Sequence, residues 1–138
     1  MLLIQKDLYI MMSSRKTNIS GIGTDIIEIE RLRNSYLRKG QAFIDKLFTD
    51  DEKKYCLKYK DPIPHFAARF AAKEAVVKAL GIGFGKEISF LDIEIVNESN
   101  GKPIVIVSEN AKKNFNYTNI LISISHSEKY ATAFCLIQ

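Results

Sequence analysis

The pattern of hydrophobic and polar positions changes its period near the start of the ordered part of the sequence. Residues 19–25 alternate as a short strand does, and from Ile26 to Tyr36 the apolar positions recur at helical spacing. This change of period predicts a strand that runs directly into a helix. Asp25 stands at the predicted junction.

Two further helices are predicted by their start and stop signals. A Thr-Asp-Asp-Glu capping box that begins at Thr49 predicts a helix over about 50–59. A longer helix is predicted over about 65–80, because two prolines introduce it and Gly81 follows it as a C-terminal cap.

The remainder of the chain is rich in strand signals. Four strand-like runs cover 88–96, 104–107, 120–125 and 130–137, and a short helix is expected near 109–116. The strands and helices do not alternate regularly, and the later strands read as hairpins. We therefore predict an α+β fold with a mainly antiparallel sheet packed on the long helix.

The long helix carries charges where a buried helix should have none. From residue 66 to residue 80 every position is apolar except Arg69, Lys73, Glu74 and Lys78. Large side chains form one stripe and alanines form another nearly opposite, which predicts packing on both sides. Charges on such a helix are costly unless they are paired or liganded. We interpret the two lysines and Glu74 as lining a cavity, and an i,i+4 salt bridge between Glu74 and Lys78 is the alternative.

Three other positions are candidates for chemistry, each with a plain structural alternative. Asp25 is either a helix N-cap or a carboxylate held for a hard cation such as Mg²⁺. His126 is either an ordinary strand-end residue or a site residue at the rim of the sheet. The glycine-containing loop 81–85 follows a helix instead of opening one, so it is a weak nucleotide signature.

Composition and charge narrow the class of protein only moderately. The 138 residues fit one domain, and the net charge of +4 suits an acidic protein, an anionic cofactor or nucleic acid. Residues 1–18 read as a poorly ordered extension before a domain at 19–138. No stretch approaches the roughly 20 apolar residues of a membrane span, and no secretory signal is present, so we expect a cytoplasmic protein.

The cysteines and histidines exclude the common soft-metal sites. Cys56 and Cys135 lack metal-type spacing and are expected to be buried thiols in a reducing compartment, without a disulfide. The chain has only two histidines, so a histidine-rich zinc site is not available.

Three blocks, in this order and spacing, resemble the holo-[acyl-carrier-protein] synthases, the short trimeric type of 4′-phosphopantetheinyl transferase. They are GIGTDIIEIER at 21–31, RFAAKEAVVKALG at 69–81 and SISHS at 123–127. The resemblance covers about residues 19–138. It implies transfer of 4′-phosphopantetheine from coenzyme A to a serine of apo acyl carrier protein, with release of adenosine 3′,5′-bisphosphate, in support of fatty acid biosynthesis.

The resemblance also implies roles for particular residues. Asp25 and Glu74 would bind the catalytic Mg²⁺, and Lys78 would contact the phosphates of coenzyme A. His126 would line the cofactor cleft, and Arg31 would face the acidic carrier protein.

Further parts of the implied cofactor cleft are Arg69, Gly81 and Gly83. The family usually has threonine where this chain has Ile82, in the loop that borders the adenine. Members of this type are homotrimers with active sites between protomers, which would explain a helix without a solvated face. The general base stays open between either carboxylate and a metal-bound water.

Two other readings remain. One is a small basic domain that binds nucleic acid, although the positive charge is modest and shows no repeated RNA-binding pattern. The other keeps the family fold without catalysis, as a coenzyme A-binding subunit, although Asp25, Glu74 and Lys78 are all retained. The sequence favours the enzyme, with no nucleic acid and no membrane among its partners.

Overall fold

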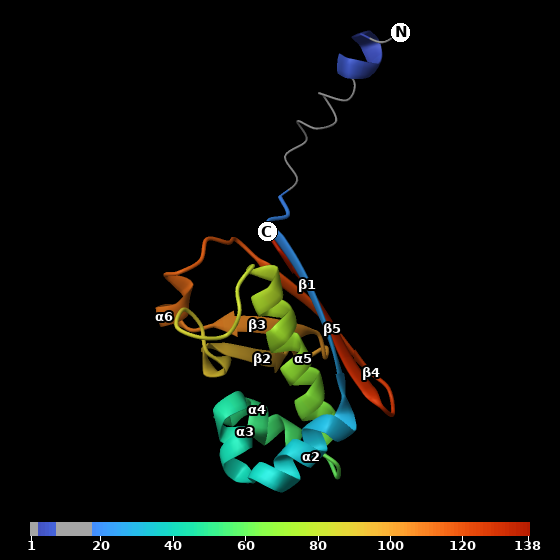
Figure 1. Ribbon diagram of the computed structural model, residues 1–138, viewed down its shortest axis with the longest axis vertical. Coiled ribbons are helices and arrows are strands. Elements are labelled where there is room, and N and C mark those ends of the chain that lie inside the picture. The colour runs from blue at the N-terminus through green and yellow to red at the C-terminus, as the bar shows by residue number, and fades with distance from the viewer. Residues whose placement is uncertain (1–2, 8–17) are drawn as a thin grey trace.

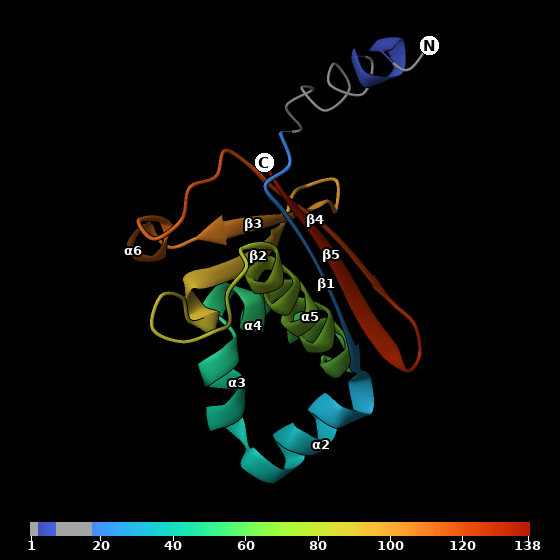
Figure 2. The same cartoon turned by 45° about the horizontal axis from the view of Figure 1, so that its top comes forward.

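The long helix α5 (Ile63–Ala79) lies at the centre of the protein and is packed on both sides. The structure, a computed structural model, describes residues 3–7 and 18–138 (Figure 1). A three-stranded sheet covers one side of α5, and a two-stranded sheet with short helices covers the other (Figures 1 and 2). Contacts within one chain are therefore enough to bury α5. The burial of this helix gives no evidence for the expected trimer.

Both sheets are antiparallel throughout, which confirms the predicted α+β class. The larger sheet has the order β1 (Gly21–Glu28), β5 (Tyr130–Ile137), β4 (Ile120–His126). The smaller sheet is a hairpin of β2 (Ile93–Asn97) and β3 (Pro103–Val107).

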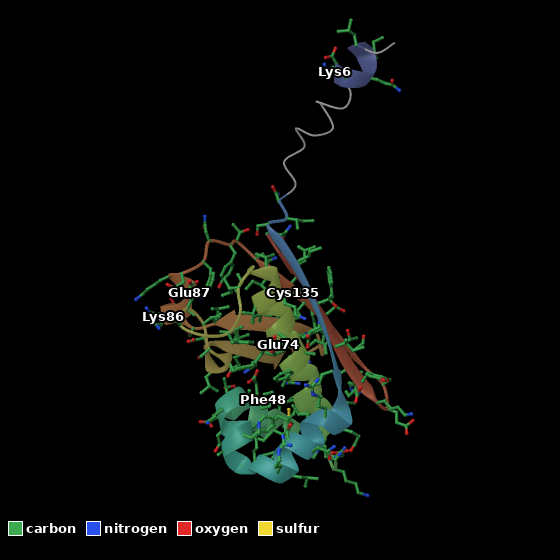
Figure 3. All side chains as sticks on the ribbon, viewed as in Figure 1. Lys6, Phe48, Glu74, Lys86, Glu87 and Cys135 are labelled. Atoms are coloured by element: carbon green, nitrogen blue, oxygen red, sulfur yellow. The ribbon has the colours of Figure 1, made fainter. Side chains whose placement is uncertain are left out.

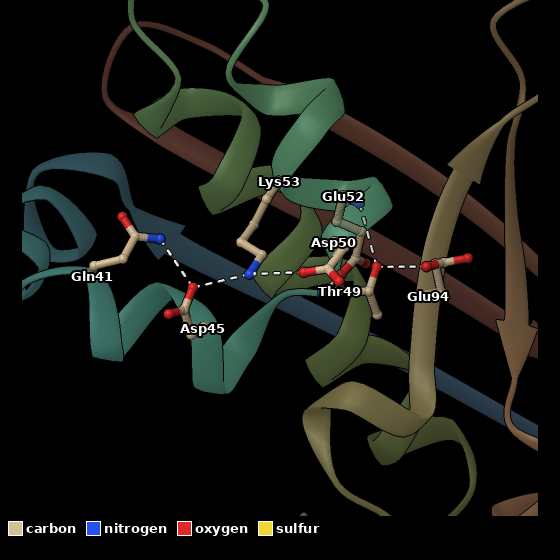
Figure 4. Close-up of polar contacts among 7 residues, drawn as sticks. All are labelled: Gln41, Asp45, Thr49, Asp50, Glu52, Lys53 and Glu94. Atoms are coloured by element: carbon tan, nitrogen blue, oxygen red, sulfur yellow. Dashed lines mark hydrogen bonds and ion pairs between the residues drawn. The ribbon is translucent and has the colours of Figure 1, made fainter.

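The helices gather mainly around the N-terminal half of α5 (Figure 2). They are α2 (Ile29–Lys39), α3 (Gln41–Leu47) and α4 (Asp50–Cys56), and the short α6 (Glu109–Lys112) lies beyond the β2–β3 hairpin. The predicted capping box is present, because Thr49 and Glu52 exchange hydrogen bonds between side chain and backbone (Figure 4). Gly81 follows α5 at φ 77°, a conformation that glycine adopts without strain, as predicted for its cap.

The first strand is longer than predicted, and this changes the place of Asp25. Ile26 and Ile27 pair with Thr132 and Ala131 of β5, so the strand continues to Glu28 and the helix begins only at Ile29. The sheet ladder thus overrides the helical spacing of the apolar residues. Asp25 lies inside β1 and is not a helix N-cap, so that alternative is wrong.

The predicted strand over 88–96 is also shorter in the structure. Residues Phe90–Asp92 form a short 3₁₀ helix, η1, and the strand begins at Ile93. The Asp92 carboxylate accepts hydrogen bonds from the backbone and hydroxyl of Ser89 and from the Ser108 hydroxyl, which stabilises the turn in place of a strand. The helix expected at 109–116 ends at Lys112.

Two glycines allow α5 to lie directly on β1. A Cβ atom at Gly23 would stand 2.0 Å from the Ala75 carbonyl oxygen, and one at Gly21 would stand 1.9 Å from that of Ala79. The alanine stripe of α5 therefore faces the glycines of β1. Asp25 is the next residue on the same face of the strand, so this close contact brings its carboxylate against α5.

The remaining sequence expectations have mixed outcomes. Both cysteines are free and buried, as predicted. No helix of the described residues is long and apolar enough to cross a membrane. The extension predicted at 1–18 lies largely outside the described residues, and within it 3–7 form a short exposed helix. Its proposed disorder stays a prediction.

Candidate active site

A pocket of about 650 Å³ opens where β1, α2 and α5 meet. Its apolar wall consists of isoleucine, leucine and phenylalanine side chains from β1, α2, α3, α5 and η1. Its polar lining consists of Asp25, Glu28, Arg31, Ser35 and Glu74. Three residues predicted for the site thus come together at one pocket.

Asp25 is joined to the lysine at the end of α5. The Lys78 Nζ atom donates hydrogen bonds to Asp25 Oδ1 at 2.9 Å and to the Thr24 carbonyl oxygen at 3.0 Å. The Lys78 side chain is 51% exposed, so its ammonium group stands at the rim of the site. The ion pair of Lys78 is with the strand instead of with Glu74, and the i,i+4 salt-bridge alternative is wrong for this pair.

Glu74 lies midway along α5 and is half-buried (Figure 3). Burial raises the pKa of its carboxyl group above the ordinary value, and the negative charge of Asp25 raises it further, while Lys78 acts in the opposite direction. The charges of the two carboxylates therefore repel one another, and the charge of Lys78 partly offsets this. A bound cation would relieve this repulsion.

The donor set fits a hard divalent cation. Mg²⁺ commonly takes one or two carboxylates and completes its shell with water and phosphate oxygens. Asp25 and Glu74 are such a pair, and among the described residues no group of three or more histidine, cysteine, aspartate or glutamate side chains is placed to hold a metal ion.

Lys73 does not line the cavity, although the sequence grouped it with Glu74 and Lys78. Its side chain is fully buried, with Nζ 2.7 Å from Glu52 Oε2. The same Nζ donates hydrogen bonds to the carbonyl oxygens of Leu47 and Phe90. Burial lowers the pKa of Lys73, and the charge of Glu52 opposes that shift. The interpretation of Lys73 as a cavity residue is wrong, because it has a tertiary partner.

Arg69 lies on a different surface from the carboxylate pair. Its guanidinium group stands 3.9 Å from the centre of the Tyr55 ring and donates a hydrogen bond of 2.7 Å to Asn97 Oδ1. It lines a second pocket, of about 460 Å³, between α4 and the β2–β3 hairpin. Its buried Nε atom has no partner within the described part of the chain.

His126 is also apart from the carboxylate pair. It is the exposed last residue of β4, at the rim of the sheet as predicted, and its ring centre lies 5.6 Å from that of His65. Gly83 is exposed in the loop that follows Gly81. Ile82 is half-buried and packs against the hydrophobic core, so its side chain supports the loop from inside.

Glu28 and Ser35, which were not predicted as site residues, line the same pocket beside Arg31. The three residues stand at the spacing i, i+3 and i+7, which places them on one face where a strand passes into a helix. That spacing was the signal that would have identified them.

The fold and site define a class of α+β protein in which two carboxylates and a lysine gather where a strand meets a packed helix. The chain matches the family model of the 4′-phosphopantetheinyl transferase superfamily over residues 21–135 and belongs to that superfamily. The resemblance stated from the three sequence blocks is therefore confirmed.

Individual relatives agree with this assignment. A holo-[acyl-carrier-protein] synthase of Protochlamydia amoebophila is 54% identical over 116 residues, 84% of this chain and 95% of the relative. The crystal structure of that enzyme type from Neisseria meningitidis superposes with a TM-score of 0.82 at 32% identity, covering 87% of this chain and 98% of the other. One from Helicobacter pylori, in complex with coenzyme A, gives a TM-score of 0.78 at 35% identity and covers 85% and 99%.

Proposed function

We propose that this protein is a holo-[acyl-carrier-protein] synthase that transfers 4′-phosphopantetheine from coenzyme A to a serine of apo acyl carrier protein. The observation that carries the proposal is that Asp25 and Glu74 line one pocket and that Lys78 forms an ion pair with Asp25 at its rim. It occurs in a chain 54% identical to a holo-[acyl-carrier-protein] synthase over 95% of that relative. The product, a holo carrier protein, supports fatty acid biosynthesis in the cytoplasm.

The chemistry requires charge neutralisation and alignment more than covalent help. The serine hydroxyl oxygen bonds to the β-phosphorus of coenzyme A, and the bond from that phosphorus to the bridging oxygen breaks. Adenosine 3′,5′-bisphosphate leaves, and the serine proton passes to a carboxylate or water of the site. Lys78, held by Asp25 and Thr24 at the rim, is suited to neutralise charge on a phosphate oxygen.

Asp25 and Glu74 would hold Mg²⁺, as their place in one pocket and the repulsion between their charges support. Bound there, the ion supplies charge neutralisation for the pyrophosphate. Asp25 is positioned for this by the glycines of β1, and Glu74 by the rigid packing of α5.

The functional assembly is a homotrimer in which Arg69 and His126 complete the cofactor cleft of a neighbouring copy. This explains why the two residues lie outside the carboxylate pocket. The outer face of the larger sheet also carries apolar side chains that the described part of the chain does not cover, at Ile22, Ile26, Leu121, Tyr130 and Phe134. Light scattering should give the mass of three chains, and a monomeric active enzyme would contradict the assembly.

Mass spectrometry tests the activity directly. Apo acyl carrier protein incubated with this protein, coenzyme A and Mg²⁺ should gain the mass of one phosphopantetheine group, and none when Mg²⁺ is chelated. Coenzyme A binding without a mass gain would favour the non-catalytic reading. Salt-dependent binding to generic DNA, with no response to coenzyme A, would favour the nucleic-acid reading.

The carrier protein is expected to dock on α2, beside the pocket. Arg31 lines the pocket and is exposed, and the exposed Leu37, Arg38 and Lys39 follow it on the same helix. Arg31→Glu should raise the KM for acyl carrier protein about tenfold or more, because it sets like charges against an acidic partner. The KM for coenzyme A should stay within about twofold, and Lys113→Glu, on the exposed end of α6, should change neither. An Arg31→Glu enzyme with an unchanged carrier KM would refute this docking surface.

A further inference from the structure

A stack of rings stands behind His126 at the end of the larger sheet. The ring of His65, near the start of α5, lies 3.5 Å from that of Tyr59 with nearly parallel planes. The ring of His126 also contacts that of His65, in an edge-to-face arrangement with 5.6 Å between the two ring centres. Both distances are in the range of favourable aromatic pairs. The position of the His126 ring is therefore restricted by side chains from a different element.

The surroundings of His65 disfavour its charged form. Burial is the largest influence and lowers the pKa of His65, and the positive charges of His126 and Arg69 lower it further. The carboxylate of Asp61 acts in the opposite direction. The titratable and charged groups that face His65 are Tyr55 and Tyr59 from α4 and its following turn, Asp61 from the next loop, Arg69 from α5 and His126 from β4.

His126 occupies a different environment, because it is exposed at the end of its strand. The His126 ring therefore faces outward from the pair, while the half-buried His65 ring lies against Tyr59.

We propose that His65, held by its stack on Tyr59, is a positioning residue for His126 and orients the exposed imidazole toward a phosphate group of the cofactor. The inference rests on the proposed function, which places His126 at the coenzyme A cleft. It adds a residue that does not itself contact the cofactor.

Nuclear magnetic resonance can test the interaction between His65 and His126 without an activity measurement. The chain has only two histidines, so two imidazole signals report the whole pair. Titration of the wild-type protein and of His126→Asn should show a higher pKa for His65 in the variant, because the variant lacks one positive charge. Saturating adenosine 3′,5′-bisphosphate should raise the pKa of His65 in the wild type and leave it unchanged in His126→Asn. An unaltered pKa of His65 in both comparisons would overturn the inference.

Steady-state kinetics separates positioning from general stability. His65→Leu removes the ring and should raise the KM for coenzyme A about tenfold. A change of this size corresponds to the loss of about one aromatic contact. The kcat should stay within about twofold of the wild-type value. His65→Phe keeps the aromatic ring and should restore the wild-type KM at neutral pH. Equal KM values for His65→Leu and the wild type would contradict the inference, as would a failure of His65→Phe to restore binding in a folded protein.

Together, the titration and the kinetics distinguish a failure of the role proposed for His65 from a failure of the proposed function. If the protein transfers no phosphopantetheine, the bisphosphate titration still decides whether His65 responds to an anion at His126. If transfer is present and His126→Asn has the wild-type KM for coenzyme A, the inference is overturned while the proposed activity stands.

Discussion

Glu74→Ala is expected to reduce phosphopantetheine transfer about a thousandfold in a protein that remains folded. The substitution removes one of the two carboxylates that would hold Mg²⁺, and the loss of one fixed electrostatic contact at a reacting group has an effect of this size. Glu74 makes no contribution to the hydrophobic clusters on either side of α5, so the packing of the helix should survive. The measurement is the rate of mass gain of apo acyl carrier protein. An active, Mg²⁺-responsive Glu74→Ala protein would refute the assignment of this site.

Thermal unfolding supplies a second readout for the same residue. The folded-state pKa of Glu74 is raised, so its ionised form is less favourable in the folded protein than in the unfolded chain, and this carboxylate lowers stability as the pH rises through that range. Without metal at pH 8, Glu74→Gln should therefore unfold at the same temperature as the wild type or higher. Mg²⁺ should raise the Tm of the wild type and not that of the variant. Glu87→Ala, an exposed carboxylate in the loop after α5 (Figure 3), is the control and should respond to Mg²⁺ as the wild type does.

The sequence was most informative where a local pattern and the tertiary contacts agree. The two stripes of the long helix predicted its double packing, and the structure places the alanines against β1 and the large residues against the other elements. The position of Asp25 could also have been predicted. Gly21, Gly23 and Asp25 alternate on one face of a strand, and this period of two was a better guide than the helical spacing that begins at Ile26.

The partners of the charged residues on α5 could not be predicted from the local sequence. Lys73, Glu74 and Lys78 stand within six positions of each other, and each has a different environment: a buried ion pair, a half-buried pocket wall and an exposed rim. Periodicity reports which face of a helix is apolar, and it does not report which distant acid is directed toward that face. The separation of Arg69 and His126 from the carboxylates depends in the same way on the path of the chain.

The buried pair of Lys73 and Glu52 is the second site where a single substitution should have a large effect. Lys73→Met should lower the free energy of unfolding by about 3–5 kcal/mol, because it leaves an uncompensated carboxylate in the interior. Glu52 would keep its hydrogen bonds from the backbone of Thr49 and Ile95, which do not neutralise its charge. Urea unfolding measures the loss.

The double variant Lys73→Met/Glu52→Gln separates the ion pair from simple packing. It removes both charges and keeps side chains of similar size, so it should recover a large part of the stability lost in Lys73→Met. Lys53 is the matched control, because it lies on α4, the helix of Glu52, and pairs with Asp45 and Asp50 near the surface (Figure 4). Lys53→Met should cost less than about 1 kcal/mol. Equal losses for Lys73→Met and Lys53→Met would show that the buried charge is not what holds α4, η1 and α5 together. Unequal losses with no recovery in the double variant would assign the effect to the contacts of the lysine with the Leu47 and Phe90 carbonyls, which line the wall of the active-site pocket.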